Sequence, residues 1–98
     1  MVLLKNAAAM LPLAKDLPTL YVAGVAADNI GIQCGGWTIE WQGKRGDITP
    51  GTTILEAIQN TVGPDTNVIY DEMAQFDAVS DDTPVVCLGV VGEWPYAE

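Results

Sequence analysis

The last residue of the chain is a carboxylate in a position that suits enzyme chemistry. Glu98 closes residues 92–98, which follow the apolar run of residues 85–91. That run predicts a buried strand, and open α/β sheets bind their ligands just beyond the carboxyl ends of their strands. The chain holds no histidine, so carboxylates are its main candidates for proton transfer. We interpret Glu98 as a candidate catalytic acid; Glu93 lies in the same loop, where most glutamates are simply solvated.

A glycine-rich block, residues 33–43, holds two of the three tryptophans, Trp37 and Trp41. At a spacing of four residues, both indoles would share one face of a strand or one side of a helix. A tryptophan in a small protein is more often part of the core or of an interface. Flat aromatic faces, however, also bind the C–H faces of sugar rings. The block therefore predicts either an aromatic binding platform or buried packing.

The elements that must position these residues follow from hydrophobic patterning. Apolar, β-branched runs predict three strands, at residues 19–24, 67–70 and 85–91. Residues 53–62 predict the clearest helix, because Thr53 and Glu56 have the spacing of a capping box and the apolar residues form one stripe.

Three weaker elements are expected as well. They are a helical turn near residues 30–34, a loop or small hairpin through 44–47, and a short helix with a solvated loop within 71–82.

Strands that alternate with a helix indicate an α/β fold with parallel strands and right-handed crossovers. We expect a three-layer α/β/α sandwich with a mostly parallel, flavodoxin-like sheet. One good helix is too few to cover both faces of such a sheet. Residues 1–98 are therefore expected to form a single partial domain, about half of a complete one.

The net charge and the hydrophobic content of the chain limit the classes of partner that it is expected to bind. The formal charge is −9, from 13 acidic against 4 basic residues, which argues against nucleic acid and disfavours an anionic membrane surface. No stretch approaches the ~20 apolar residues of a membrane span. A neutral carbohydrate is not penalised by this charge. Hydrophobic residues reach 49%, which is high for so small a domain and suggests a larger parent body or self-association.

Other chemistries are less well supported. Residues 24–31 follow a strand, where a phosphate loop would lie, but Ala26 replaces a required glycine and no Walker lysine follows. We expect instead a tight turn, with Asp28 or Asn29 capping the next helical turn. Cys34 and Cys87 are expected to be buried free thiols.

The remaining acidic residues are interpreted as a solvated face and not as a metal site. They are Asp71, Glu72, Asp77, Asp81 and Asp82. No cofactor and no metal is therefore predicted.

Several blocks together resemble a known family. In chain order they are residues 2–6, 11–13, 22–24 with 27–29, 34–43, 51–57, and 92–93 with 95–98. This ordered set resembles the second, C-terminal domain of family 3 glycoside hydrolases, especially the β-D-glucan exohydrolase and β-glucosidase branch. The block Gly-Gly-Trp-Thr-Ile-Glu-Trp-Gln-Gly is its most specific part, and the resemblance runs essentially end to end.

The resemblance implies an α/β/α sandwich that follows a (β/α)8-type first domain bearing an aspartate nucleophile. Glu98 matches the acid/base glutamate of the family, and Trp41 matches one jaw of the tryptophan clamp at the +1 glucosyl position. Trp37 also matches the block, and we assign it to packing. Trp94 departs from the family, where histidine is frequent. The implied substrate is a β-glucoside or β-glucan oligosaccharide, and the implied parent enzyme is secreted or periplasmic.

The chain ends at Glu98 and has no first domain, so we expect a fragment of a retaining enzyme that is inactive alone and lacks its barrel domain partner. The alternative is a stand-alone flavodoxin-like binding or assembly module, with its tryptophans buried in an oligomer interface. Under either interpretation we expect a homo-oligomer, formed through an exposed sheet edge or apolar face.

Overall fold

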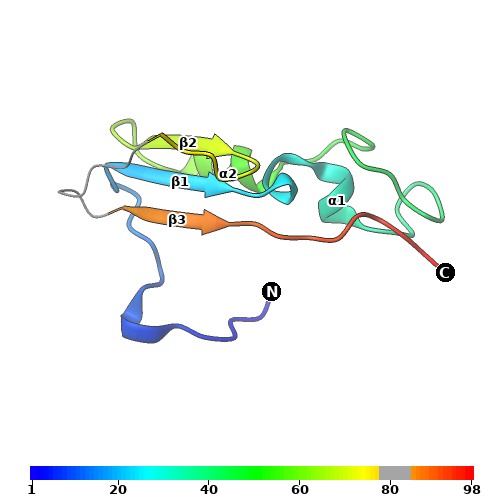
Figure 1. Ribbon diagram of the computed structural model, residues 1–98, viewed down its shortest axis with the longest axis horizontal. Coiled ribbons are helices and arrows are strands. Elements are labelled where there is room, and N and C mark those ends of the chain that lie inside the picture. The colour runs from blue at the N-terminus through cyan, green and yellow to red at the C-terminus, as the bar shows by residue number, and fades with distance from the viewer. Residues whose placement is uncertain (78–84) are drawn as a thin grey trace.

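A computed structural model describes residues 1–77 and 85–98 of the chain (Figure 1). Its elements in order are η1 (Ala7–Ala9), β1 (Thr19–Ala23), η2 (Val25–Asp28), α1 (Ile30–Cys34), α2 (Ile54–Thr61), β2 (Asn67–Asp71) and β3 (Val86–Gly89). The N-terminal segment with η1 extends away from the sheet, whereas α1 and the C-terminus lie beyond the tips of the strand arrows.

The three strands form one sheet in the order β2-β1-β3. Both pairings are parallel, with Leu20 opposite Val68 on one side and Val86 on the other. The order 2-1-3 is also the start of a flavodoxin-like sheet. The prediction of a parallel α/β fold is confirmed, and the arrangement is consistent with an incomplete α/β/α sandwich.

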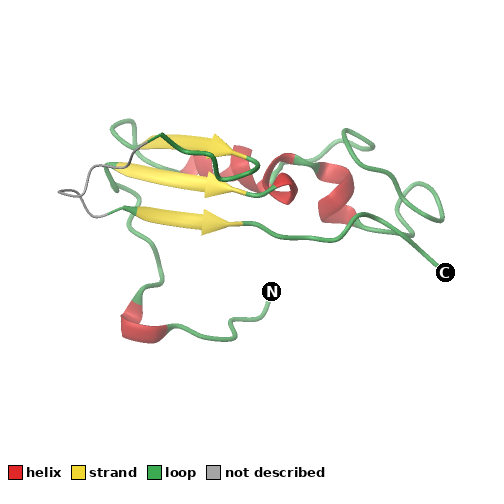
Figure 2. Cartoon of the chain, in the orientation of Figure 1, coloured by secondary structure: helices red, strands yellow, loops and turns green. Residues whose placement is uncertain are grey.

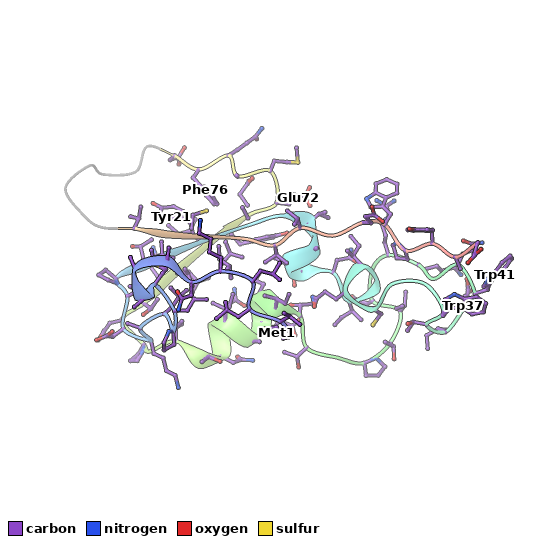
Figure 3. The ribbon with its side chains drawn as sticks, turned by 90° about the horizontal axis from the view of Figure 1, so that it is seen from below. Met1, Tyr21, Trp37, Trp41, Glu72 and Phe76 are labelled. Carbon is purple, nitrogen blue, oxygen red and sulfur yellow. The ribbon has the colours of Figure 1, made fainter. Side chains whose placement is uncertain are left out.

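The core lies on one face of this sheet. Leu20 and Val22 of β1 are 4% and 0% exposed, and they form a cluster with Ala27 and with Leu55 of α2. Figure 2 shows α2 behind the sheet, close to β1 and β2. On the opposite face Tyr21 contacts the ring of Phe76 edge-on, at 4.8 Å between ring centroids (Figure 3). β1, the central strand, therefore has contacts on both of its faces, as expected for a uniformly apolar strand.

The start of α2 is held by the predicted capping box. The Thr53 hydroxyl accepts a hydrogen bond from the Glu56 N–H at 3.1 Å, and the Glu56 carboxylate accepts one from the Thr53 N–H at 3.4 Å. Thr53 also donates its hydroxyl proton to Asp28 Oδ1 at 2.9 Å. The same threonine thus ends the loop before α2 and joins that helix to η2, which follows β1.

The predicted turn after β1 is also confirmed. Asn29 caps α1 by accepting from the Ile32 N–H at 3.0 Å, and its Oδ1 also accepts from the Gly46 N–H at 2.8 Å. One side chain therefore closes the loop of residues 35–46 back onto the start of α1.

Two expectations about burial need correction. The strand predicted at residues 85–91 as fully buried is β3, which is shorter, pairs only with β1 among the described residues and exposes Cys87 and Gly89. An edge strand with one uncovered face alternates in burial, and the sequence cannot show which strand takes the edge. Cys34 and Cys87 are both exposed free thiols, not buried ones.

A short helix is expected within residues 71–82. Residues 72–77 of this range form a turn and a loop, and residues 78–82 lie outside the described part. Residues 44–47 form a loop and not a hairpin. Among the helices of residues 1–77 and 85–98, none has the length and apolar character needed to cross a membrane.

Tyr70 links the sheet to the turn after β1 and predicts a pH dependence. Its hydroxyl donates to the Gly24 carbonyl at 3.3 Å. Burial raises the pKa of Tyr70 above 10.0, and the carboxylates of Glu72, Asp28 and Asp71 raise it further. Because the folded state holds this proton more tightly than the unfolded chain, the stability it contributes is complete below the unfolded pKa. That stability is lost as the pH rises through the folded pKa.

The free energy of unfolding should therefore fall from about pH 9 upward, and Tyr70→Phe should make that fall shallower. Urea unfolding followed by circular dichroism at a series of pH values measures it. Tyr96→Phe is the matched control, because Tyr96 is 68% exposed. Equal slopes for wild type and Tyr70→Phe would contradict the prediction.

Candidate active-site half

The candidate site forms where the chain leaving β1 meets the chain leaving β3. After β1 the chain passes through η2 and α1 into the loop of residues 35–46, and after β3 it runs on as the C-terminal segment, residues 92–98. The segment starts close to η2 and α1: a Cβ on Gly92 would lie 3.2 Å from Ile32 and 3.3 Å from Ala26. Parallel pairing places both connections at the same edge of the sheet, so the loop and the segment lie side by side.

Two glycines allow this close approach. A Cβ on Gly36 would lie 2.1 Å from the carbonyl oxygen of Tyr96, which is far inside van der Waals contact. A Cβ on Gly43 would lie 2.8 Å from the Pro95 side chain, and Gly43 has φ +73°, a conformation that L-residues rarely adopt. The glycines of the block therefore serve the contact between loop and segment.

Two side chains of the loop hold the segment directly. Gln42 Oε1 accepts a hydrogen bond from the backbone N–H of Ala97 at 2.8 Å. The Arg45 guanidinium lies 3.8 Å from the centroid of the Trp94 ring, a cation–π contact. Thus Trp94, the departure from the family pattern, has a specific partner in this chain.

The two tryptophans of the block form a paired aromatic surface. The centroids of the Trp37 and Trp41 rings are 6.2 Å apart, and the ring planes are inclined at 58°. The backbone N–H of Trp37 donates a hydrogen bond to the backbone carbonyl of Trp41 at 2.9 Å. This segment is neither the strand nor the helix considered from the spacing. Positive φ angles at Trp37 (63°) and Ile39 (62°) turn it into a tight loop. Figure 3 shows both indoles at one end of the molecule, well away from Met1 and Tyr21.

The assignment of Trp37 to packing is wrong for this chain. Trp37 is 75% exposed and Trp41 is 53% exposed. The tight turn at Trp37 and Ile39 directs both indoles outward, an outcome that spacing alone does not reveal. Both rings are therefore available to a ligand or to another polypeptide surface.

Glu98 lies at the same edge of the sheet. It is exposed, as is Glu93, and it follows Ala97, whose N–H is bound to Gln42. Gln42 in turn follows Trp41, so the two predicted site residues are carried on backbone segments that one hydrogen bond joins. No cluster of three or more metal-binding side chains forms within the described ranges.

Gln42 and Arg45 are the site residues that the sequence analysis did not single out. Gln42 and Ala97 are 55 positions apart, and spacing carries no signal for such a contact. The only pointer was the place of Gln42 beside Trp41.

Gly36→Ala should release the segment from the loop, because the added methyl group cannot fit against the Tyr96 carbonyl. We expect the amide resonances of residues 94–98 in an NMR spectrum to move toward random-coil positions, while those of β1 and α2 stay in place. Gly63→Ala is the matched control, since its Cβ would make an ordinary 3.5 Å contact with the Lys15 carbonyl. An unchanged spectrum for Gly36→Ala would show that the loop and the segment do not pack as described.

Comparison with known proteins identifies the family of the chain. No curated protein matches the chain. Residues 1–96 match the family model described as the glycosyl hydrolase family 3 C-terminal domain. Because the match covers nearly the whole chain, with both the tryptophan loop and most of the C-terminal segment inside it, the chain belongs to the C-terminal domain family of family 3 glycoside hydrolases.

Proposed function

We propose that this chain supplies the acid/base carboxylate and the +1 aromatic platform of a retaining β-glucosidase or β-glucan exohydrolase. Glu98 is the acid/base and Trp41 is the platform. The observation that carries the proposal is the Ala97–Gln42 hydrogen bond of 2.8 Å, which joins the segment of Glu98 to the loop of Trp41. Family membership over residues 1–96, which include Trp41 and end two residues before Glu98, supports the proposal.

The chemistry needs a second carboxylate. Retaining glycosidases work with two carboxyl groups about 5 Å apart, one attacking the anomeric carbon and the other serving as acid and then base. Glu98 protonates the departing glycosidic oxygen and later takes a proton from the water that cleaves the glycosyl–enzyme bond. The attacking aspartate comes from the barrel domain that the resemblance implies. Trp41 offers a flat face to the sugar ring on the leaving-group side.

The exposure of both residues supports a site that is shared with another domain. Glu98 and Trp41 are exposed, and Trp41 reaches 53%. Catalytic acids work best in sites that are shielded from bulk water, and sugar clamps need a second wall. The barrel domain would supply both the cover and the opposing wall. The chain by itself should then hydrolyse nothing.

A chimera tests the proposal: this chain replaces the matching segment of a family 3 β-glucosidase. Glu98→Gln should lower kcat/KM by about 10²–10⁴-fold for a substrate with a poor leaving group, such as an alkyl β-glucoside. For 2,4-dinitrophenyl β-glucoside the loss should be small, because that leaving group departs without protonation. Glu93→Gln is the matched control and should leave both values near those of the unmutated chimera.

Two companion measurements complete the test. The isolated chain should show no turnover of an aryl β-glucoside, and turnover that Glu98→Gln abolishes would overturn the claim that it is inactive alone. In the chimera, equal kcat/KM values for Glu98→Gln and Glu93→Gln would overturn the acid/base role.

A second candidate function is an assembly module. It is favoured by the exposure of Trp37, Trp41 and Trp94, which are 75%, 53% and 61% exposed, and by the uncovered sheet face at Cys87. Apolar surface of this kind favours contact with another chain. We propose that the isolated chain forms a homo-oligomer, which sedimentation equilibrium at micromolar concentration measures. A monomer over the whole concentration range would contradict this proposal and leave the glycosidase proposal intact.

A further inference from the structure

One hydrogen bond lies between the two residues to which we assign chemistry. Gln42 Oε1 accepts from the Ala97 N–H at 2.8 Å. Gln42 is the residue after Trp41, and Ala97 is the residue before Glu98. Any change in this contact therefore acts on the backbone next to both the aromatic platform and the carboxylate.

The other contacts of the segment bring it close but do not define its position in the same way. At Gly36 and Gly43 the loop packs against the Tyr96 carbonyl and the Pro95 side chain of the segment, and such packing is not directional. A hydrogen bond is directional and weakens steeply as its angle departs from linear. Residues 94–98 lie beyond the end of β3 and have no strand ladder to set their register. The hydrogen bond from Ala97 to the Gln42 side chain is the directional contact at the end of the segment that carries Glu98.

A second contact supports the same arrangement from the other end of the segment. The Arg45 guanidinium lies 3.8 Å from the Trp94 ring centroid, and its planar shape suits stacking on an aromatic face. Gln42 and Arg45 come from one loop and hold residues that are three positions apart. The loop therefore grips the segment at two points, of which the Gln42 contact is nearer to Glu98.

We infer that Gln42 is a positioning residue for Glu98, acting through the Ala97 N–H and not by touching substrate. This inference rests on the acid/base role proposed for Glu98. Gln42 sets where the carboxyl group lies relative to the Trp41 platform, and hence relative to the glycosidic oxygen of a sugar bound there. Displacement of a catalytic group by about 1 Å can cost about 10²-fold in rate.

The test uses three variants of the same chimera. Gln42→Ala removes the acceptor, Gln42→Glu keeps an acceptor oxygen in nearly the same place, and Gln59→Ala alters an exposed glutamine of α2 as the control. Each variant is assayed at its own pH optimum, which compensates for any shift of the pH profile that the charge of Gln42→Glu introduces.

We expect Gln42→Ala to lower kcat/KM by about 10–10²-fold for an alkyl β-glucoside and by less than about threefold for 2,4-dinitrophenyl β-glucoside. General loosening of the fold would lower both values together, so the difference between the substrates reports the position of the proton donor. Gln42→Glu should restore most of the loss, and Gln59→Ala should cause none. In the isolated chain, hydrogen exchange at the Ala97 amide should be faster in Gln42→Ala than in Gln42→Glu.

The outcomes separate the two proposals. If Glu98→Gln leaves the chimera fully active, the acid/base role fails and the positioning role fails with it. If Glu98→Gln removes activity while Gln42→Ala keeps kcat/KM for the alkyl glucoside, only the positioning role is overturned. An equal loss for both substrates, or the same loss in Gln42→Glu, overturns it as well.

Discussion

Parallel pairing of β1 with a strand on each side is the constraint from which the rest of the molecule follows. Because both pairings of β1 are parallel, all three strands run in one direction and end at one edge. Val22, fully buried in the middle of β1, anchors this sheet to α2 through the cluster that includes Leu55. The chain leaving β1 and the chain leaving β3 must therefore emerge together, and the candidate site is built from these two connections.

The site is best described as a loop that grips an extended segment. Gly36 and Gly43 let the backbones approach, while Gln42 and Arg45 make the specific contacts, to Ala97 and Trp94. The loop is closed in turn by Asn29, which binds the Gly46 N–H as well as capping α1. The turn after β1 is thus connected to the segment that carries Glu98, because Asn29 and Ala97 both form hydrogen bonds with the same loop.

Much of the fold could be predicted, because its signals are local. A uniformly apolar run predicts β1, the spacing of Thr53 and Glu56 predicts the start of α2, and Asp28 and Asn29 predict a capped turn, in which Asn29 is the cap. Motif order also indicated the family, which the match over residues 1–96 confirms. The errors concern properties that depend on neighbours in space. An apolar run does not say whether it will be covered on both faces, so β3 was expected to be buried and its Cys87 hidden.

The details of the candidate site were harder to predict for the same reason. The spacing of Trp37 and Trp41 does not say how the two indoles point, and positive φ angles at Trp37 and Ile39 produce a turn that leaves both of them exposed. Left-handed backbone at bulky residues is uncommon and has no reliable signal in sequence. Contacts across many residues, such as Gln42 with Ala97, depend on the assembled sheet and are invisible to spacing rules.

The edge position of β3 has a mechanical consequence. The chain passes from β3 through Val90, whose N–H still binds the Ala23 carbonyl at 2.8 Å, into the segment that ends at Glu98. In the described part of the chain, the outer side of β3 carries no strand. A further strand paired with the outer side of β3 would restrict the motion of this continuous stretch of backbone, and with it the motion of the Glu98 carboxylate at its end. The rigidity of the segment that carries Glu98, the acid/base proposed above, would then depend on a contact outside the candidate site.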